Sequence, residues 1–432
     1  MRRKTGRTGR LRERQMERQG QQQIPRGMTE RKQEQQGQKL FLPRGSAGPV
    51  DDFFETRIVI DAGGATRVDL FGLHRLCELA HRIGMENGLA VSVLDLVGMR
   101  AGESAGSAIA RSVDLARHVE GLGYRRYWLA EHHSMAGLAC SATSVLIGHV
   151  AGATRTIRVG SGGVMLPNHA PLVVAEQFGT LEAMYPGRID LGLGRAPGGD
   201  PATMRALRRG TGQTGDDFPE LLAELRGYLG PEKPGQAVRA VPGQGSNVPV
   251  TLLGSSTFSA QLAARLGLPF AFAAHFAPDD LYAAARLYRE QFRPGNLADG
   301  TLAEPHLMVA VQVIAAETDA RAGRLFTSPQ QRFLRLIRGQ AVELLPPVDS
   351  MEGIWQPWEQ TAVENRLGAA IVGSDATVRA GLEDLVRATG ANEVIAVTDL
   401  YDHADRLESY ERVAAVAKAI AVKAPEPAYG VR

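Results

Sequence analysis

The chain has 432 residues, of which 44% are hydrophobic, and its formal net charge at pH 7 is +2. This length suits one large domain with appendages and exceeds what a minimal domain needs. The charge is uneven, because residues 1–44 hold thirteen Lys and Arg against four Glu, a net +9 that leaves −7 for the remainder. The basic character therefore belongs to the N-terminal segment and does not indicate a folded nucleic-acid-binding domain.

Residues 1–50 are rich in Gln, Arg, Gly and Glu and carry almost no aliphatic pattern. Such a segment buries too little apolar surface to offset the entropy lost on ordering, so we expect disorder. Residues 51–84 are ambiguous, since Leu at helical spacing is flanked by sequence typical of loops. We assign 1–84 as a disordered basic tail and 85–432 as the folded domain. Alternatively, translation begins at Met85 and the tail is an over-extended start.

The two cysteines, Cys77 and Cys140, form neither a disulfide framework nor a metal-ligand pattern, which suits a reducing cytoplasm. No apolar run in the sequence reaches the length of a transmembrane helix. The N-terminus also lacks the apolar core of a secretory signal. We therefore expect a cytoplasmic protein that has no membrane and no nucleic-acid partner.

From residue 89 onward, short apolar runs alternate with stretches of helical periodicity. The predicted strands are 89–95, 125–131, 157–165, 188–194, 249–254, 269–274, 306–315 and 393–399. The predicted helices are 104–122, 141–153, 171–185, 201–209 with 217–229, 257–266, 278–292 and 404–421. Continuous apolar strands between helices indicate a parallel sheet covered on the outside. Eight such units indicate an α/β fold of the (β/α)₈ TIM-barrel class.

Residues 316–390 separate the last two predicted strands by more than one crossover helix requires. Long insertions at barrel loops commonly form lids or substrate walls, and we predict such a lid here. A surface excursion with no part in catalysis is the alternative for most of this segment.

Polar residues follow the carboxyl ends of successive predicted strands, where a barrel of this class places its active site. The residues concerned are Asp95, Glu131, His132, His133, Asn168, His169, Arg195, Ser255, Ser256, His275 and Asp399. Adjacent residues at a strand end point in different directions, so His132 and His133 do not naturally chelate one ion, and we assign no metal site. Structural hydrogen bonding and general acid–base work both remain open for them.

Gly254, Ser255 and Ser256 precede a helix, and Arg195 ends another strand. Free amides at a helix N-terminus together with a guanidinium can cradle a phosphate, although Ser at a helix start is more often only a cap. Gly162 and Gly163 lie inside a predicted strand, where glycine indicates either close approach of another group, such as a flat ring system, or a barrel bulge. The sequence contains neither a dinucleotide-binding motif after the first strand nor a nucleotide-triphosphate-binding motif.

The motifs now resemble a known family. They are Ala-Glu-His-His at 130–133, the block 160–171 that ends in Pro-Asn-His-Ala-Pro, Ala-Glu-Gln at 175–177, Tyr-Pro-Gly-Arg-Ile-Asp-Leu-Gly-Leu-Gly-Arg at 185–195, Leu-Gly-Ser-Ser at 253–256, Gly-Leu-Pro at 267–269 and Val-Gly-Ser at 372–374. Over about residues 89–420 the chain resembles the bacterial luciferase-like flavin monooxygenases, and within them the single-chain MsnO-type branch.

The resemblance implies reduced FMN at the barrel mouth, with Asp95, Gly162, Gly163, Arg195, Gly254, Ser255 and Ser256 as cofactor-binding residues. Within this set, Arg195 and the Ser255–Ser256 backbone would hold the phosphate, and a cis peptide bond between Gly162 and Gly163 would lie under the flavin. His132 matches the catalytic histidine, and His133, Asn168 and His169 would line the substrate pocket. Luciferase carries a reactive cysteine where this chain has Gly194, which argues against light emission.

The implied activity is a monooxygenase reaction in which FMNH₂ and O₂ form a C4a-peroxyflavin that oxygenates a small organic substrate. A separate flavin reductase would supply FMNH₂, and the family usually dimerises through outer barrel helices, so a homodimer is expected. One alternative is a hydride-transfer oxidoreductase that uses F420 on the same barrel. The other is a non-enzymatic flavin-storage or flavin-sensing protein.

Overall fold

The computed structural model describes residues 88–196, 201–207, 215–295 and 300–421, together with two short strands, β1 (Val59–Ile60) and β2 (Thr66–Arg67), which pair antiparallel. The rest of the predicted tail lies outside the described residues, so its disorder and the alternative start at Met85 stay predictions. The chain divides into two compact units, Met1–Gly72 and Leu73–Arg432, and the second unit holds the fold described below.

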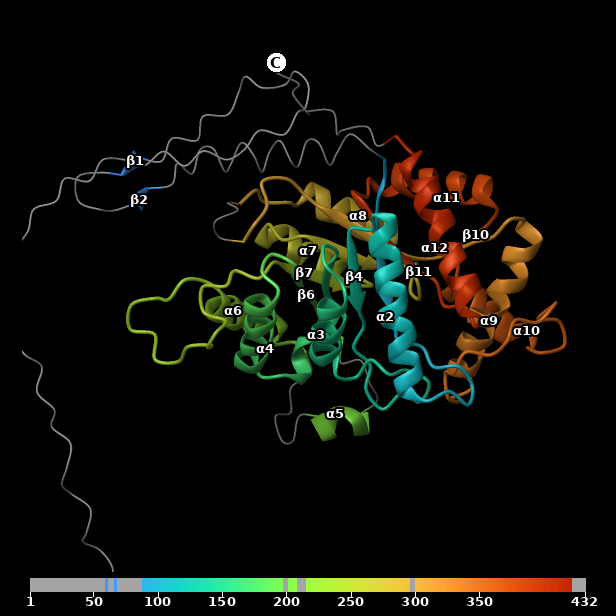
Figure 1. The fold of residues 1–432 in the computed structure, drawn as a ribbon, viewed down its shortest axis with the longest axis horizontal. Helices are drawn as coiled ribbons and strands as arrows, with labels where there is room; N and C mark the ends of the chain where they lie inside the picture. The colour runs from blue at the N-terminus through green and yellow to red at the C-terminus, as the bar shows by residue number, and fades with distance from the viewer. Residues whose placement is uncertain are drawn as a thin grey trace, which may run out of the picture. The chain divides into compact units, whose positions relative to one another are not determined.

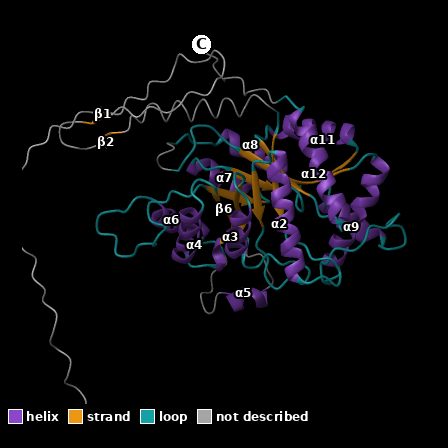
Figure 2. Ribbon diagram, viewed as in Figure 1, coloured by secondary structure: helices purple, strands orange, loops and turns teal. Residues whose placement is uncertain are grey.

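Eight parallel strands close into a barrel, seen at the centre of Figure 2. They are β3 (Ala90–Asp95), β4 (Arg126–Leu129), β5 (Arg158–Met165), β6 (Ile189–Gly194), β7 (Val250–Gly254), β8 (Phe270–Ala273), β9 (Leu307–Ala315) and β11 (Glu393–Val397). The pairing of β11 with β3 and of β8 with β9 completes the ring. The predicted TIM-barrel fold is confirmed, and the predicted strands differ from these bounds by at most two residues at either end.

Helices cover the outside of the barrel (Figure 1). They are α2 (Ala105–Leu122), α3 (Thr143–Ala153), α4 (Pro171–Met184), α6 (Phe218–Leu229), α7 (Thr257–Leu266), α8 (Leu281–Glu290), α11 (Asp375–Thr389) and α12 (His403–Lys418), with a short α5 (Pro201–Leu207) and a 3₁₀ turn, η1 (Leu166–Asn168). The ends of α2 follow from the sequence. The Ser104 side chain accepts a hydrogen bond from the Ser107 amide at the start, and Gly123, with φ 87°, ends the helix. None of the described helices is long and apolar enough to cross a membrane.

The predicted insertion between the last two barrel strands contains three helices and a strand that the sequence pattern did not resolve. They are α9 (Asp319–Ile337), α10 (Pro357–Arg366), β10 (Ile371–Gly373) and α11. β10 pairs with the carboxyl end of β9, and α11 packs against both α8 and α12. Helix α11 is thus an ordinary member of the outer ring, and only α9, α10 and their connections extend beyond a regular barrel.

The connection between α9 and α10 is fastened to the loops that follow β3 and β4. The Leu344 amide donates to Met99 O at 2.8 Å, and the Ala101 amide donates to Leu344 O at 3.0 Å. The Val342 amide donates to Ala136 O at 2.8 Å. This part of the insertion therefore lies along the rim at which the strands end, and its role as a lid stays a prediction.

Buried charges at the amino ends of the strands form a network across the barrel floor. The Arg126 guanidinium donates to Asp190 at 2.8 Å and to Glu393 at 3.0 Å. Asp190 also accepts from the indole of Trp128 at 3.1 Å. Because each carboxylate has several donors, these charges tolerate burial. The network also fixes the position of the Trp128 ring.

A second buried ion pair lies at the opposite ends of the strands. Arg406 of α12 donates to Asp95 Oδ1 at 3.0 Å, while Ser112 Oγ, at 2.6 Å, and the Tyr127 hydroxyl donate to Asp95 Oδ2. Burial alone would raise the pKa of Asp95, but the Arg406 cation and the two hydroxyl donors hold that pKa well below its usual range. Asp95 is therefore a structural anion that ties α12 and α2 to β3.

We expect Arg406→Met to lower the free energy of unfolding by about 3–5 kcal/mol, because the Asp95 carboxylate would remain buried without its cation. Denaturation by urea, followed by circular dichroism, measures the change. The matched control is Arg412→Met on the same helix, whose partner Glu408 is exposed and whose loss should cost less than about 1 kcal/mol. Equal losses in the two variants would show that the Asp95–Arg406 pair does not stabilise the fold.

Candidate active site

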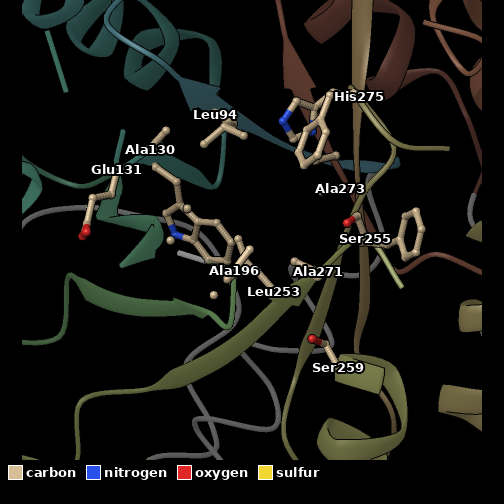
Figure 3. Close-up of a pocket in the computed structure, with 18 of the residues that line it drawn as sticks. Leu94, Ala130, Glu131, Ala196, Leu253, Ser255, Ser259, Ala271, Ala273 and His275 are labelled. Atoms are coloured by element: carbon tan, nitrogen blue, oxygen red, sulfur yellow. The ribbon is translucent and has the colours of Figure 1, made fainter. Parts of the chain in front are cut away.

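A cavity opens at the carboxyl ends of the strands, and Figure 3 shows part of its wall. Side chains and backbone from six successive strands, β3 to β8, and the loops after them form most of its surface. The predicted site residues that line it are His132, Gly162, Gly163, Arg195, Gly254, Ser255 and Ser256. The structure therefore brings together seven residues that are spread over 125 positions of the chain.

One corner of this cavity is suited to an anion. Ser256 caps α7 without any side-chain hydrogen bond to the first turn, so the amides of that turn keep bonding capacity. The Arg195 guanidinium lies 4.3 Å from the ring centre of Phe258, on the same first turn of α7. Among the described residues no carboxylate pairs with Arg195. A guanidinium beside an uncapped helix N-terminus is an arrangement that suits a phosphate group.

The floor of the cavity is built largely from backbone. The peptide bond between Gly162 and Gly163 is cis, as the family resemblance predicted. A Cβ on Gly162 would lie 2.7 Å from Leu94 Cδ1, and a Cβ on Gly163 would lie 2.7 Å from Gly192 O. These positions hold glycine because neighbouring strands leave no room for a side chain, and the exposed peptide planes offer a surface for a flat ring.

His132 stands at the end of β4 and lines the cavity. Burial, together with the nearby Arg332 cation, lowers the pKa of His132 to about 4. Its Nδ1 atom lies 3.8 Å from the Cys140 sulfur, a hydrogen-bond contact for sulfur. The imidazole is therefore neutral near pH 7 and has one described partner on its ring.

The other two predicted histidines turn away from this wall. His133 Nε2 and His169 Nε2 each lie 2.8 Å from Glu131 Oε1, and neither ring lines the cavity. Burial alone would raise the pKa of Glu131, but its bonds to His133 and His169 give a net lowering. The three ligand atoms lie within 4.8 Å of one another, a spacing that a metal ion could also use. Since both contacts have hydrogen-bond lengths, we describe the cluster as a hydrogen-bonded network that supports the Glu131–His133 loop.

Two further predicted contacts lie behind the cavity wall. Asn168 is buried in η1 and is not among the lining residues. Asp95 is also absent from the lining, and both of its oxygens already accept protein donors. Its expected contact with a cofactor is therefore not supported by its position, because closure of the barrel turns this carboxylate toward α2 and α12.

Several apolar lining residues were not selected from the sequence, whereas His275 was named there among the polar residues that follow predicted strands. Trp128, Met165, Phe272 and Phe276 supply apolar surface, and His275 adds a second imidazole at the end of β8. Burial lowers the pKa of His275 to about 4. The strand pattern contained a signal for His275, since it follows the sixth predicted strand. Nothing in the periodicity distinguishes an aromatic residue of the cavity from one of the core.

The matches to known proteins agree with this geometry. A family model described as luciferase-like monooxygenase matches residues 89–415. The chain belongs to the luciferase-like monooxygenase family. A luciferase-like monooxygenase of Escherichia coli (strain K12) is 53% identical over 323 residues, which are 75% of this chain and 95% of that protein. The crystal structure of apo-MsnO8 covers 76% of this chain and 98% of its own, with 35% identity and a TM-score of 0.67. The family expected from the motifs is thus confirmed.

Other members of the family carry more specific names. The N-acetyl-S-alkylcysteine monooxygenase of Bacillus subtilis (strain 168) is 33% identical over 335 residues, 75% of this chain and 96% of that protein. Membership in the luciferase-like family and its monooxygenases identify the protein as an oxidoreductase.

Two solved structures below 25% identity share the fold and were determined with different cofactors. The oxygenating constituent of 3,6-diketocamphane monooxygenase of Pseudomonas putida, in complex with FMN, has 20% identity and a TM-score of 0.58, and covers 77% of this chain and 99% of its own. An F420-dependent secondary alcohol dehydrogenase has 14% identity and a TM-score of 0.57, and covers 76% of this chain and 99% of its own. Structures of this fold thus include one complex with FMN and one with an F420 adduct.

If the cavity takes FMN, Arg195→Met should weaken its binding by about 10- to 150-fold, because a charge-assisted contact to the phosphate would be lost. Quenching of flavin fluorescence measures this affinity. Riboflavin, which lacks the phosphate, should bind the variant and the unchanged protein equally well. Arg265→Met, at the exposed far end of α7, is the control and should leave both affinities unaltered. A parallel loss of FMN and riboflavin binding would contradict a phosphate role for Arg195.

Proposed function

We propose that this protein is an FMN-dependent monooxygenase, which takes up reduced FMN and uses O₂ to oxygenate a small organic substrate. One observation carries the proposal: the Arg195 guanidinium, an uncapped helix N-terminus and a neutral imidazole line a single cavity whose floor is made of glycine backbone. Each of these features matches one part of a flavin mononucleotide.

The residues present fit FMN from end to end. Arg195 and the amides that follow Ser256 would hold the phosphate, and the Gly162–Gly163 backbone would lie against the ring system. When bound, the reduced flavin supplies the electrons and the reaction with O₂, chemistry that amino-acid side chains do not provide. The part left to the protein is to bind, to orient and to exclude water.

The apolar wall of the cavity excludes water. Leu94, Leu253 and Phe272 line it, and they offer no hydrogen-bonding group to a solvent molecule. A dry wall strengthens each electrostatic contact inside the cavity and prevents hydrolysis of reactive species. We propose that the α9–α10 part of the insertion adds to this barrier, because it is bonded to the rim beside β3 and β4.

His132 is the proposed catalytic residue. His132 and Glu131 both line the cavity after β4, but the Glu131 carboxylate is already held by His133 and His169. A hydrogen bond from the His132 ring to an oxygen of the reacting group would orient that group over the flavin. His275, from the end of β8, would meet the substrate at a second point.

A separate reductase is the proposed source of reduced FMN. The cavity described above is accounted for by one flavin and a small substrate, and the described residues carry no dinucleotide motif of the Gly-rich type. Monooxygenases of this kind depend on an external supply of the reduced cofactor, so a flavin reductase is the expected partner.

The reaction class is tested by mixing the anaerobic protein with FMNH₂ and then admitting O₂ while absorbance is recorded. An oxygenated flavin species with a lifetime longer than that of free FMNH₂ in O₂ is the expected result. Reduced F420 is the parallel probe. If a carbonyl substrate oxidises reduced F420 in the absence of O₂, the reaction is hydride transfer. If the protein retains oxidised FMN tightly without turnover, its role is storage or sensing.

We expect His132→Ala to lower turnover by about 10²- to 10⁴-fold while FMN affinity stays within about severalfold. The physical reason is that the imidazole acts on the reacting group, whereas Arg195 and α7 carry most of the binding. Product formation and flavin fluorescence measure the two quantities. His118→Ala on the outer helix α2 is the control. Equal losses of turnover and affinity would exclude a catalytic role for His132.

We propose a homodimer formed through α3 and α4, which lie side by side in Figure 1. Val145 on α3 is 70% exposed, and Val173 and Met184 on α4 are 44% and 57% exposed. Exposed aliphatic residues grouped on neighbouring helices mark interaction surfaces. Val145→Glu with Val173→Glu should convert the dimer to a monomer in analytical ultracentrifugation. Leu336→Glu, at a 40% exposed leucine of α9, should not change the mass.

A further inference from the structure

The side of His132 that faces away from the cavity is enclosed by residues for which the proposed function has no use. Cys140, in the loop between β4 and α3, is fully buried and is a free thiol. Its sulfur lies 3.8 Å from His132 Nδ1. Arg332 of α9 and Asp399, which follows β11, form a buried ion pair of 2.8 Å in the same region.

We propose that the Cys140 thiol donates its hydrogen to Nδ1 of His132, so that the neutral imidazole carries its own proton on Nε2 and presents an N–H donor to the cavity. Cys140 is thus a positioning residue, which fixes both the tautomer and the orientation of the ring. His132 itself acts as a hydrogen-bond donor and not as a general acid that exchanges its proton near pH 7.

The direction of the Cys140–His132 bond follows from the chemistry of its two ends. Burial raises the pKa of Cys140 to about 12, against a smaller opposing effect of the His132 backbone amide, so the sulfur keeps its hydrogen at neutral pH. An imidazole nitrogen with a lone pair is a strong acceptor, whereas a thiol sulfur is a weak one. The favourable arrangement is therefore S–H donating to Nδ1. In a neutral imidazole the remaining nitrogen, Nε2, must then be the protonated one.

Burial and the Arg332 cation keep the ring neutral. The ionisable groups that face it are Glu131, His133 and Cys140 of the β4–α3 loop, Arg332 of α9, Asp399 after β11 and His275 after β8. Burial has the largest effect on the pKa of His132, and the Arg332 cation is the largest charge effect and acts in the same direction. Glu131 and Asp399 oppose it more weakly. The insertion thus contributes a cation to the active site from behind the barrel rim.

The consequence for the reaction rests on the proposed function. A neutral N–H donor stabilises a developing negative charge on an oxygen without giving up its proton, so the oxygen keeps its reactivity. A positively charged imidazole would instead transfer its proton to such an oxygen. A fixed donor orients the reacting group and needs no change of protonation during turnover.

Infrared spectroscopy of the full-length protein without flavin tests the bond directly, because the S–H stretch lies in a spectral window free of other protein bands. In a Cys77→Ser background only the Cys140 thiol contributes. We expect its band at lower frequency than that of a thiol without an acceptor, and we expect His132→Phe in the same background to move it upward. A band at the frequency of a non-donating thiol, or one that His132→Phe leaves in place, would overturn the proposal.

Nitrogen-15 spectra of histidine-labelled protein test the tautomer. The His132 signals, assigned by their loss in His132→Gln, should show an unprotonated Nδ1 and a protonated Nε2 that stay constant between about pH 5 and 8. Cys140→Ala should shift both signals toward an exchanging mixture of tautomers, and Cys140→Ser, which keeps an O–H donor, should restore the original pair. A protonated Nδ1 in the unchanged protein would overturn the proposal even if neither Cys140 variant folds.

These readouts need neither cofactor nor substrate, so they are independent of the proposed monooxygenase reaction. If the tautomer is as expected and no oxygenation of any substrate is found, the proposed function fails and the positioning by Cys140 stands. If oxygenation is found but Nδ1 is protonated, the proposed function stands and the positioning by Cys140 fails.

Discussion

Closure of eight parallel strands is the constraint on which the site depends. In a closed parallel barrel every strand has its neighbours on both sides, and all carboxyl ends meet at one rim. Residues 132, 195 and 254–256 are far apart in the chain, yet they face one cavity because their strands end at that rim. The outer helices and the polar network at the amino ends of the strands keep the barrel closed. The closed barrel in turn holds the Arg195 guanidinium, the N-terminus of α7 and the His132 imidazole at fixed positions.

The sequence predicted the barrel because its strands are apolar throughout and its helices carry clear starts and stops. It also predicted seven of the residues that line the cavity, since polar residues and glycines at strand ends fall on a shared rim. Asp95 shows the limit of this argument: its position at a strand end was read correctly, but the direction of its side chain depends on Arg406, 311 residues later. Trp128 and the contact of Cys140 with His132 likewise depend on packing that no local pattern encodes.

The insertion shows a different limit. Its length suggested a lid, but the periodicity did not separate α11, which belongs to the outer ring, from α9 and α10, which do not. The part that matters for the site is a single buried arginine, Arg332. It precedes β11 in the chain, whereas its partner Asp399 follows β11. Long-range ion pairs of this kind leave no signal in a single sequence, because either residue alone resembles an ordinary surface charge.

The glycine floor restricts how this protein can diversify. A Cβ on Gly163 would lie 2.7 Å from the backbone of β6, and one on Gly162 would lie 2.7 Å from Leu94 Cδ1, so substitution is restricted at these two positions of the cavity floor. New substrate preferences in descendants of this chain must therefore arise on the opposite side, from the loops and the insertion, while the face that receives the ring remains the same. Libraries built to alter the substrate range are therefore best confined to the loops and the insertion, with His132, Cys140 and Arg332 left unchanged.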